Sequence, residues 1–394
     1  MKCVAGASGC LLVAMVATGC GLLPTGGHPS VGPASALSPM GHGLREYRAA
    51  FHVHCYLSHD SDGPIEVIAS SAKALGIDTV ILNDHYEAGN VARAPRGVQH
   101  GVLFLPGLEL RAGQEASILA FDVREDFDNK LSGAGRLAEM HRQGAVSVIG
   151  HVEEVKDWNA EPFQGPFDAF EVYNLHAQFK EASRLGIALR LLTLAPDAFF
   201  AASIENPTAN LALWDHELAR GRRLAGLAGH DAHANVRVFG QLGGTIGTYA
   251  ELFRLFSNHI LSPEWTVEGI ADGVRRGRTF VTFDFLGDGT GFAVSYGAKG
   301  AAADARAILG DTAPYRSDHV LQVRVPPEPA PPKNAAPARQ LATPLIRVLR
   351  DGEEIGSAQD RTLDMPLPGA GVYRVEVYRG NRLWIVASPM YITP

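Results

Sequence analysis

The chain has 394 residues, and 46% of them are hydrophobic, which is enough to build a large core and two domains. The formal net charge of −7 leaves no basic footprint, so we do not expect nucleic acid as a partner. Three of the four cysteines lie within the first twenty residues, which excludes a disulfide framework in the body of the protein.

Residues 1–20 have the pattern of a secretory signal, with Lys2, an apolar run over 11–16 and small residues before Cys20. The sequence Ala17-Thr18-Gly19-Cys20 resembles a bacterial lipobox, which implies cleavage before Cys20 and lipid attachment to its sulfur. A plain cleaved signal and an uncleaved apolar start are the alternatives. Residues 21–44 are rich in Gly, Pro, Ser and Ala and predict a flexible tether. We therefore expect an exported protein, anchored through Cys20 to a bacterial membrane on the periplasmic side or cell surface, with no protein partner indicated.

Residues 45–285 alternate between strand-like and helix-like segments. The predicted helices cover 65–75, 131–143, 209–220 and 262–276, the last one starting at Ser262-Pro263-Glu264. The predicted strands include 79–82, 146–149 and 224–228. The order strand, helix, strand implies parallel strands joined by right-handed crossovers, so the predicted class is α/β.

Residues 286–394 form a second predicted domain. From Thr279 onward, apolar and polar residues alternate in the pattern typical of strands. We expect these strands at 279–283, 319–325, 345–349, 372–377 and 382–386. Asp351-Gly352 is a hairpin turn signal. These features predict a small, antiparallel, sandwich-like domain of β-structure that carries no chemistry.

The residues with metal chemistry follow the strands. His52 and His54 are separated by one residue, so a regular strand would project both imidazoles from one face toward a shared cation. Five later apolar runs also end in a His, Asp or Glu. These ends are Asp84-His85, Glu109, His151, Glu171 and the segment His230-Asp231-Ala232-His233. In barrels of parallel strands such ends gather at one mouth, so the repetition predicts a metal site.

These motifs resemble those of the PHP (polymerase and histidinol phosphatase) metallohydrolases over residues 45–285. The matching segments are His52-Val53-His54, Ser58-His59-Asp60, Asn83-Asp84-His85, Gly107-Leu108-Glu109, His151 and Asp231-Ala232-His233. The resemblance implies a distorted seven-stranded (β/α) barrel with two or three metal ions that usually hydrolyses phosphate esters. The segments 275–281 and 384–389 are similar to the carbaryl-hydrolase-like branch, whose members cleave carbamate or ester bonds.

The resemblance also implies roles for single residues. The implied metal ligands are His52, His54, Asp60, His85, Glu109, His151, Asp231 and His233. Glu109 is the implied bridging ligand and takes part in catalysis. We expect Asp84 either to support the ligands or to transfer protons. We expect His230 either to donate a proton to the leaving group or to have a structural role. His59 is the alternative to Asp60, and His176 stays open.

One departure leaves the metal count open, because no histidine occurs between Glu109 and His141. We expect two to three divalent ions, with Zn, Mn or Fe favoured by mixed His and carboxylate ligands. The expected reaction is attack by a metal-bridging hydroxide on a phosphoester, or on a carbamate or ester bond, of a small molecule. Two alternatives remain: a lipid-anchored binding protein on an inactive barrel, and an amidohydrolase-type enzyme. The absence of a lysine at any strand end argues against the second.

Overall fold

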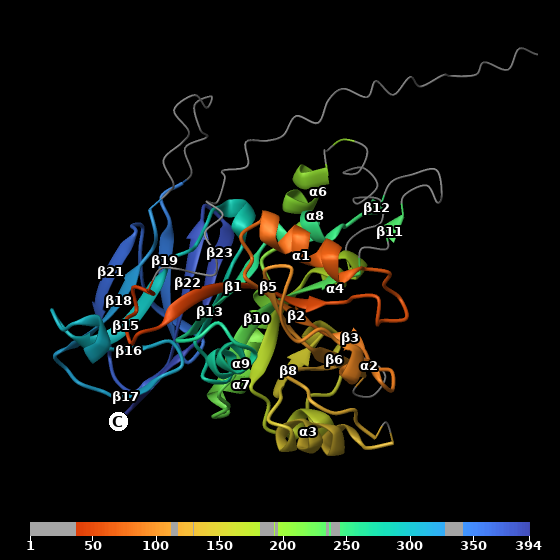
Figure 1. Ribbon diagram of the computed structural model, residues 1–394. Helices are drawn as coiled ribbons and strands as arrows, with labels where there is room; N and C mark the ends of the chain where they lie inside the picture. Colours follow the sequence, from red (N-terminus) through yellow and green to blue (C-terminus); the bar gives the residue numbers. More distant parts are fainter. Residues whose placement is uncertain are drawn as a thin grey trace, which may run out of the picture.

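The computed structural model describes residues 37–394 except 112–116, 129, 182–192, 194–195, 234–235, 238–244 and 328–341. The fold is mixed α/β, with one large sheet and a second, small antiparallel sheet (Figure 1), as the class prediction required. The signal segment and Cys20 lie outside the described residues. At the end of the range predicted as a tether, Met40 and Leu44 are buried in a hydrophobic core, because apolar side chains interrupt the Gly- and Pro-rich composition there. None of the described helices is long and apolar enough to cross a membrane.

The strands that position the site pair mainly in parallel. They are β1 (Arg45–Val53), β2 (Thr79–Leu82), β5 (Val102–Leu105), β8 (Val146–Gly150), β9 (Ala169–Asn174) and β10 (Ala225–Ala232). Between β5 and β8 come β6 (Gly107–Arg111) and β7 (Ser117–Phe121). Pairings lead from β1 to β2 and β5, and from β6 through β7, β8, β9 and β10 back to β1. Strand β7 is antiparallel to both of its neighbours, β6 and β8. The sequence analysis did not predict this strand.

The predicted helices are present outside these strands. They are α1 (Ile65–Ala74), α3 (Gly133–Arg142), α7 (Thr208–Ala219) and α9 (Val267–Arg275). The predicted start of the last helix at Ser262 is wrong, because Ser262 ends strand β13 (Ser257–Ser262) and Thr266 caps the helix by accepting a hydrogen bond from the Gly269 amide. The shorter elements of this half are β3 (Asp84–His85), α2 (Asn90–Arg93), β4 (Gly97–Gln99), α4 (Leu175–Glu181), α6 (Pro196–Ser203), β11 (Val236–Arg237), β12 (Thr245–Ile246) and α8 (Tyr249–Phe253).

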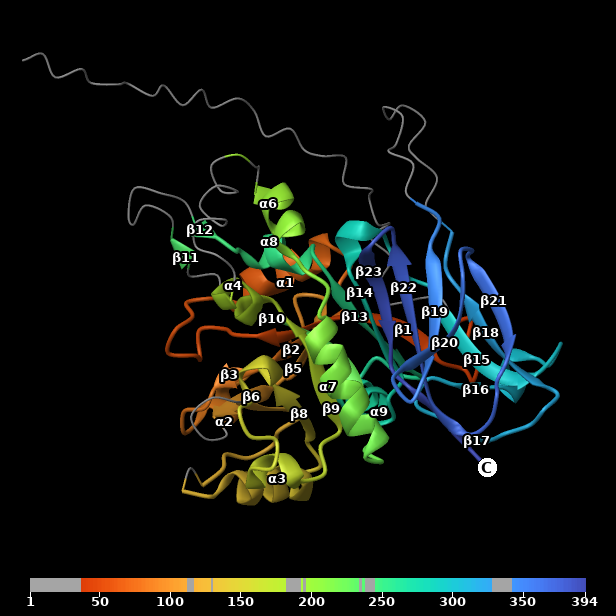
Figure 2. The ribbon, with the colours of Figure 1, turned by 180° about the vertical axis from the view of Figure 1, so that it is seen from behind.

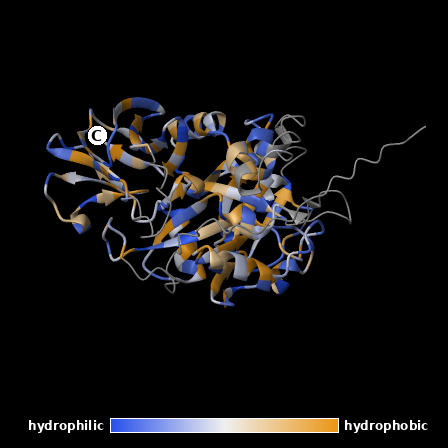
Figure 3. Ribbon diagram, turned by 90° about the horizontal axis from the view of Figure 1, so that it is seen from above, coloured by the Kyte–Doolittle hydropathy of each residue, from blue (hydrophilic) through white to orange (hydrophobic). Residues whose placement is uncertain are grey.

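One hydrophobic core lies directly beneath the candidate site. Every strand of these pairings except β6 contributes side chains to it, among them Phe51, Leu105 and Leu227, and α9 packs against it through Ile270 and Val274. The colouring in Figure 3 shows hydrophobic residues along the central strands. Burial of this layer fixes the strand ends, so the polar residues that follow them are held in place.

The C-terminal strands divide between two sheets. Strands β15 (Ala293–Ala298), β16 (Ala307–Ile308), β18 (His319–Arg324) and β21 (Thr362–Pro366) form the small sheet. Strands β17 (Thr312–Pro314), β19 (Leu345–Arg350), β20 (Glu353–Ala358), β22 (Gly371–Arg379), β23 (Arg382–Ala387) and β24 (Met390–Thr393) belong to the large sheet. The predicted Asp351-Gly352 turn joins β19 to β20, with positive φ at both residues.

The large sheet continues across the predicted domain boundary. Strand β14 (Thr279–Thr282) pairs with β13 on one side and with β23 on the other. Figure 2 shows β13, β14, β23 and β22 side by side. The two halves of the chain therefore share backbone hydrogen bonds through β14.

A buried polar cluster lies where β1 meets β13. His259 Nδ1 is 2.6 Å from Glu46 Oε1, and His259 Nε2 is 3.2 Å from Ser257 Oγ. The Gly291 amide donates to Glu46 as well, at 3.0 Å. All three side chains are buried, and the His259 ring stacks on Phe280. Inside the protein, these polar groups therefore serve as hydrogen-bond partners for one another.

Candidate metal centre

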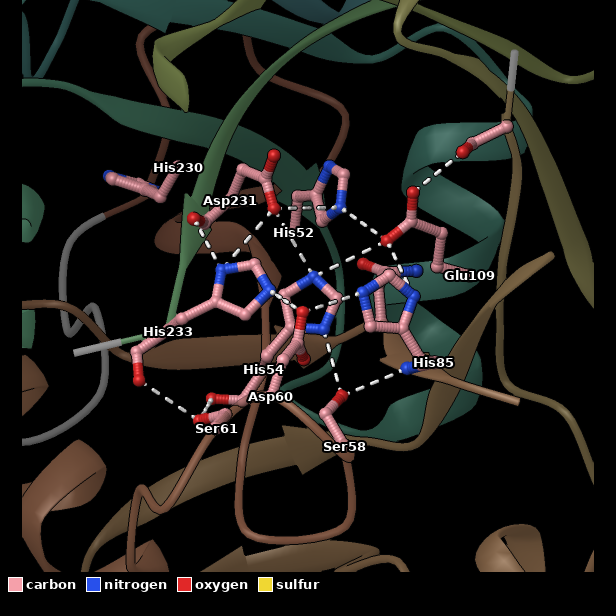
Figure 4. A network of polar contacts seen from close by, with 12 residues as sticks. His52, His54, Ser58, Asp60, Ser61, His85, Glu109, His230, Asp231 and His233 are labelled. Carbon is pink, nitrogen blue, oxygen red and sulfur yellow. Dashed lines mark hydrogen bonds and ion pairs between the residues drawn. The ribbon is translucent and has the colours of Figure 1, made fainter. Parts of the chain in front are cut away.

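The eight predicted ligands come together as two adjacent groups. Figure 4 labels all of them except His151. The inner group contains His52, Glu109, His151 and Asp231, all of them buried. The outer group contains His54, Asp60, His85 and His233, of which only His54 is fully buried. Within each group the potential ligand atoms all lie within 4.8 Å of one another.

Backbone irregularities bring these side chains into place. The register of β1 shifts between Phe51 and Val53 against β10, and between Ala50 and Val53 against β2, which marks a bulge at His52. The expected regular alternation of His52 and His54 is therefore replaced by a kink, although both rings still face the same centre, 5.2 Å apart. His52, His151 and Asp231 have φ angles of 59°, 47° and 48°. Left-handed backbone at three of the four inner residues is typical of strain held at a functional site.

Glu109 lies between the two groups. Its Oε2 is 3.4 Å from His52 Nε2 in the inner group, and 3.5 Å from His54 Nε2 and 3.3 Å from His85 Nδ1 in the outer group. Its Oε1 is 3.2 Å from His151 Nε2 and accepts a hydrogen bond from Ser117 at 2.6 Å. A carboxylate in this position can bind two cations at once.

A tight backbone approach delivers Glu109 to this place. A Cβ on Gly107 would lie 2.2 Å from the Leu82 carbonyl oxygen and 2.3 Å from that of Ala120, so only glycine fits where β6 passes its neighbours. In the Gly107-Leu108-Glu109 motif, the glycine is therefore required by sterics and the glutamate by its metal chemistry.

Two further carboxylates complete the groups. Asp231 Oδ1 is 3.3 Å from His54 Nε2 and 3.5 Å from His52 Nε2, so Asp231 also faces both groups. Asp60 Oδ2 is 3.1 Å from His85 Nε2 and 3.2 Å from His233 Nε2. Asp60, rather than His59, belongs to the outer group.

The charges of the inner group are strongly coupled. Burial alone would raise the pKa of Glu109, but hydrogen bonds from His151 and His52 hold it well below its usual range. Burial alone would lower the pKa of His151, yet Glu109, Glu171 and Asp231 raise it to about 9. The pKa of His52 is raised well above its usual value against the same burial effect, by Asp231, Glu171 and Glu109. Without a cation, protonated imidazoles supply the positive charge that the buried carboxylates require.

The chemistry of the donor set fits divalent cations. Burial lowers the pKa of His54 to about 4, with His233 and His52 adding to the effect, so this imidazole is neutral at pH 7. The buried Nε2 atom of His54 has no hydrogen-bond partner within the described part of the chain, and the same holds for Nδ1 of His151 and Nε2 of His233. The neutral imidazole of His54 and the carboxylate oxygens that it faces are part of an N/O ligand set suited to Zn, Mn or Fe.

Behind the ligands lie the supporting side chains of Asp84, for which the sequence analysis expected this role, and of Glu171 and Ser58, for which it did not. His52 Nδ1 is 2.7 Å from Glu171 Oε1, and the backbone amide of His151 donates to Glu171 Oε2 at 2.7 Å. Ser58 Oγ is 2.9 Å from His54 Nδ1 and donates to Asp84 Oδ1 at 3.0 Å. The sequence marks Glu171 as a carboxylate that follows an apolar run. Its contact with His52 could not be predicted in this way, because the two residues are 119 positions apart in the chain.

For Asp84 and for His230, the structure favours one of the two roles that the sequence analysis expected. Asp84 is buried and accepts hydrogen bonds from the Cys55 amide and Ser58, so it supports ligands and does not face a substrate. His230 lies apart from the cluster in Figure 4, with both ring nitrogens 3.1–3.2 Å from the carbonyl oxygens of Phe51 and Phe256. Burial lowers its pKa to about 4. The proton-donor role proposed for His230 therefore does not fit its location, and the structural alternative does.

Within the described residues, the remaining histidines add no ligand to either group. His141 lies on α3, 3.1 Å from Ser147 Oγ, as expected for a helix residue away from the site. His176 is exposed, with its ring centre 6.1 Å from that of His233. Ser117 donates to Oε1 of Glu109, the oxygen that also lies 3.2 Å from His151 Nε2.

Comparisons with known proteins give a distant structural likeness only. Neither the protein-family models nor the curated proteins contain a match. Among solved structures, the chain is similar to a two-domain protein from Bacteroides vulgatus ATCC 8482 that contains a predicted PHP-like metal-dependent phosphoesterase. The likeness covers 88% of this chain and 96% of that chain at 14% identity, with a TM-score of 0.40. A likeness this distant defines neither a family nor a reaction, and the carbaryl-hydrolase-like branch stays a prediction. The side chains alone identify this cluster as a candidate centre for divalent metal ions.

Proposed function

We propose that the protein is a metal-dependent hydrolase on a PHP-type seven-stranded barrel. Two series of strand pairings support the barrel, one from β1 through β2 to β5 and the other from β6 through β7, β8, β9 and β10 to β1. The observation that carries the function is the position of Glu109, with one carboxylate within 3.5 Å of imidazoles from both groups. That position supports two cation sites that share a ligand.

The residues divide the work of the site. His52, His151 and Asp231 would hold one cation, His54, Asp60, His85 and His233 the other, and Glu109 would bind both. Bound cations would supply a water of lowered pKa and a positive centre for the negative oxygen of the transition state. The strand ends and the core beneath them keep the ligands rigid, so little reorganisation accompanies the reaction. Zn, Mn or Fe fits these ligands, with two ions accounted for by the two groups and a third left as an alternative.

The substrate is a small molecule, and a phosphoester is the first candidate. Pairs of cations that share ligands are common in phosphatases. A carbamate or ester bond is the alternative for the same centre. A cavity of about 230 Å³ is lined partly by Glu153 of η1 (Val152–Glu154) and by Asn174 at the end of β9. Asn174 also donates to Glu171, whose other carboxylate oxygen lies against His52, so one hydrogen-bonded carboxylate links the cavity wall to the inner group. None of the eight candidate ligands lines this cavity.

Turnover by the loaded protein tests the proposal. The purified chain, loaded with Mn²⁺ or Zn²⁺, is offered aryl phosphates, aryl carbamates and aryl esters, and release of the phenol is followed. We expect hydrolysis that requires the metal and is lost in Glu109→Gln. A folded, fully loaded protein that cleaves none of the three classes would overturn the hydrolase and favour the alternative of a binding protein on an inactive barrel.

The location is a separate proposal, supported by the lipobox-like sequence before Cys20. We propose that the mature chain is exported and held at a bacterial membrane by lipid on Cys20. In Cys20→Ala, lipid attachment has no thiol to use, so the protein should move from the detergent phase to the aqueous phase in phase separation. Unchanged partition would contradict the anchor without affecting the proposed chemistry.

A further inference from the structure

Two buried carboxylates lie behind the candidate metal centre, one behind each group. Glu171 is fully buried and faces the inner group, whereas Asp84 is 1% exposed and faces the outer group. We propose that each of these carboxylates sets the affinity of one cation position independently of the other. The inference rests on the two cation positions of the proposed function, but not on the reaction that they catalyse.

Glu171 holds two inner residues from different strands. Its Oε1 accepts from His52 Nδ1 on β1, and its Oε2 accepts from the backbone amide of His151 after β8. Asn174 donates to Oε2 as well, at 3.2 Å. In the neutral His52 that a cation requires, the proton lies on Nδ1 and points to Glu171, so Nε2 directs its lone pair toward Glu109 and Asp231. One carboxylate therefore fixes the tautomer of His52 and the left-handed backbone of His151.

The contact between Glu171 and His52 needs a glycine on the neighbouring strand β10. A Cβ on Gly229 of β10 would lie 1.9 Å from Glu171 Oε1 and 3.1 Å from His52 Cβ. No side chain fits there without displacing the carboxylate. Gly229 thus offers a second way to disturb Glu171 while leaving the carboxylate itself unchanged.

Asp84 reaches the outer group through a hydroxyl. Ser58 Oγ accepts from the backbone amide of His85 at 2.9 Å, is 2.9 Å from His54 Nδ1, and donates its single proton to Asp84. Since the ionised carboxylate can only accept, His54 must donate from Nδ1 to Ser58, which leaves Nε2 free to bind a cation. Ser58 thus orients His54 and anchors the backbone of His85, two residues of the outer group.

The two supports do not share a hydrogen bond. Glu171 bonds to His52, His151 and Asn174, and Asp84 bonds to Cys55 and Ser58. A change in one support should therefore weaken one cation position first. Loss of such supporting contacts costs about 10- to 100-fold in metal affinity.

The experiment counts and locates manganese in variants of the full chain, without substrate. In Glu171→Gln the amide cannot accept from both His52 and the His151 amide, so the inner position should lose affinity about 10- to 100-fold. In Ser58→Ala the outer position should lose affinity by a similar factor, because His54 and His85 lose their acceptor. Elemental analysis after dialysis gives the count, and anomalous scattering from crystals of each variant shows which position remains filled.

Glu46→Gln is the matched control. It removes the charge of another buried glutamate that bonds to a histidine, His259, but lies outside both ligand groups, so its metal content should equal that of the wild type. If Glu171→Gln fails to fold, Gly229→Ala tests the same contact and should also empty the inner position first. Loss of both ions together in Glu171→Gln and in Ser58→Ala, or full occupancy in both, would overturn independent control. Neither result depends on whether the protein hydrolyses a phosphoester.

Discussion

Glu109 is the single residue on which the proposed chemistry depends most. In Glu109→Gln one amide oxygen replaces two carboxylate oxygens, and the charge that both cations would share is lost. We expect a loss of roughly 100-fold in turnover, together with lower metal content. Folding should persist, because Glu109 lies at the end of the strands and not in the layer beneath. Turnover and elemental analysis of the same sample check this result.

Near-normal turnover in a folded Glu109→Gln protein would remove the bridging role. Ser117→Ala is a useful companion, since it removes only the 2.6 Å hydrogen bond to Glu109 Oε1. Its effect should be smaller than that of Glu109→Gln, because both carboxylate oxygens remain available.

Protons should leave the inner group when cations enter. The pKa of His151 is raised to about 9 and that of His52 is raised well above its usual value, so both imidazoles are protonated at pH 7.5 in the cation-free protein. A metal ligand must be neutral, and binding therefore releases protons. Below pH 9 the protonated form of His151 dominates, and protons then compete with the metal. The apparent metal affinity should therefore fall as the pH is lowered from 9, and rise as the pH is raised toward 9.

Calorimetric titration in two buffers of different ionisation enthalpy measures the number of protons released. In His151→Asn that number should drop by about one. Metal binding that releases no proton at pH 7.5 would contradict the charge state assigned to the inner group.

Among the elements, α7 is tied to the C-terminal sheet by a buried ion pair. Arg374 on β22 is 2% exposed, and its Nε and Nη2 each lie 2.7 Å from a carboxylate oxygen of Asp215 on α7. The guanidinium also lies 4.9 Å from the Trp214 ring. In Asp215→Ala a buried cation loses its main partner, so we expect the free energy of unfolding to drop by about 3 kcal/mol.

Denaturant unfolding of Asp215→Ala beside the wild type checks this value. Asp272→Ala is the control, since it removes an exposed ion pair with Arg276 on α9 and should change stability little. Equal stability of the Asp215 variant and the wild type would mean that Glu376, 3.1 Å from Arg374 Nη1, compensates fully.

At this scale the sequence predicted most regular elements and missed the irregular ones. Hydrophobic periodicity located α1, α3 and α7 because each buries one face, and it located β2, β8 and β10 because strands buried on both sides read as apolar runs. It missed β13, in which Ser257, Asn258 and His259 precede only two apolar residues, and it also missed β7, although that strand is an apolar run. It placed the start of α9 four residues early. The ligand residues could be predicted from the strand ends, whereas the bulge at His52 and the contact of Glu171 depend on partners far away in the chain.

For the whole molecule, the shared sheet has a consequence for the predicted boundary at residues 285/286. Deletion of 286–394 would remove β23 and leave one edge of β14 without its partner. It would also remove Leu383 and Val386, which are buried in the largest hydrophobic core together with residues such as Phe256 and Val281. We therefore expect residues 37–285 alone to be insoluble or to unfold at much lower denaturant concentration than the full chain.

Expression and denaturant unfolding of the truncated chain measure this dependence. A truncated protein as stable as the full chain would show that the two halves are independent domains. The full chain with Arg382→Ala, which removes two hydrogen bonds to the carbonyl groups of Ala201 and Ile204, is a milder probe of the same junction.

The buried cluster of Glu46, His259 and Ser257 has a further consequence for how hydrolases are recognised. Its order, carboxylate to imidazole to hydroxyl, is that of a serine hydrolase triad, with contacts of 2.6 and 3.2 Å. A search by interatomic distances alone would therefore assign this protein a nucleophilic serine. Ser257 is fully buried, however, and its oxygen also accepts from Arg48 Nε at 3.4 Å. No acyl group can reach such a hydroxyl. A search for serine hydrolases by interatomic distances must therefore also require that the serine hydroxyl is accessible to solvent.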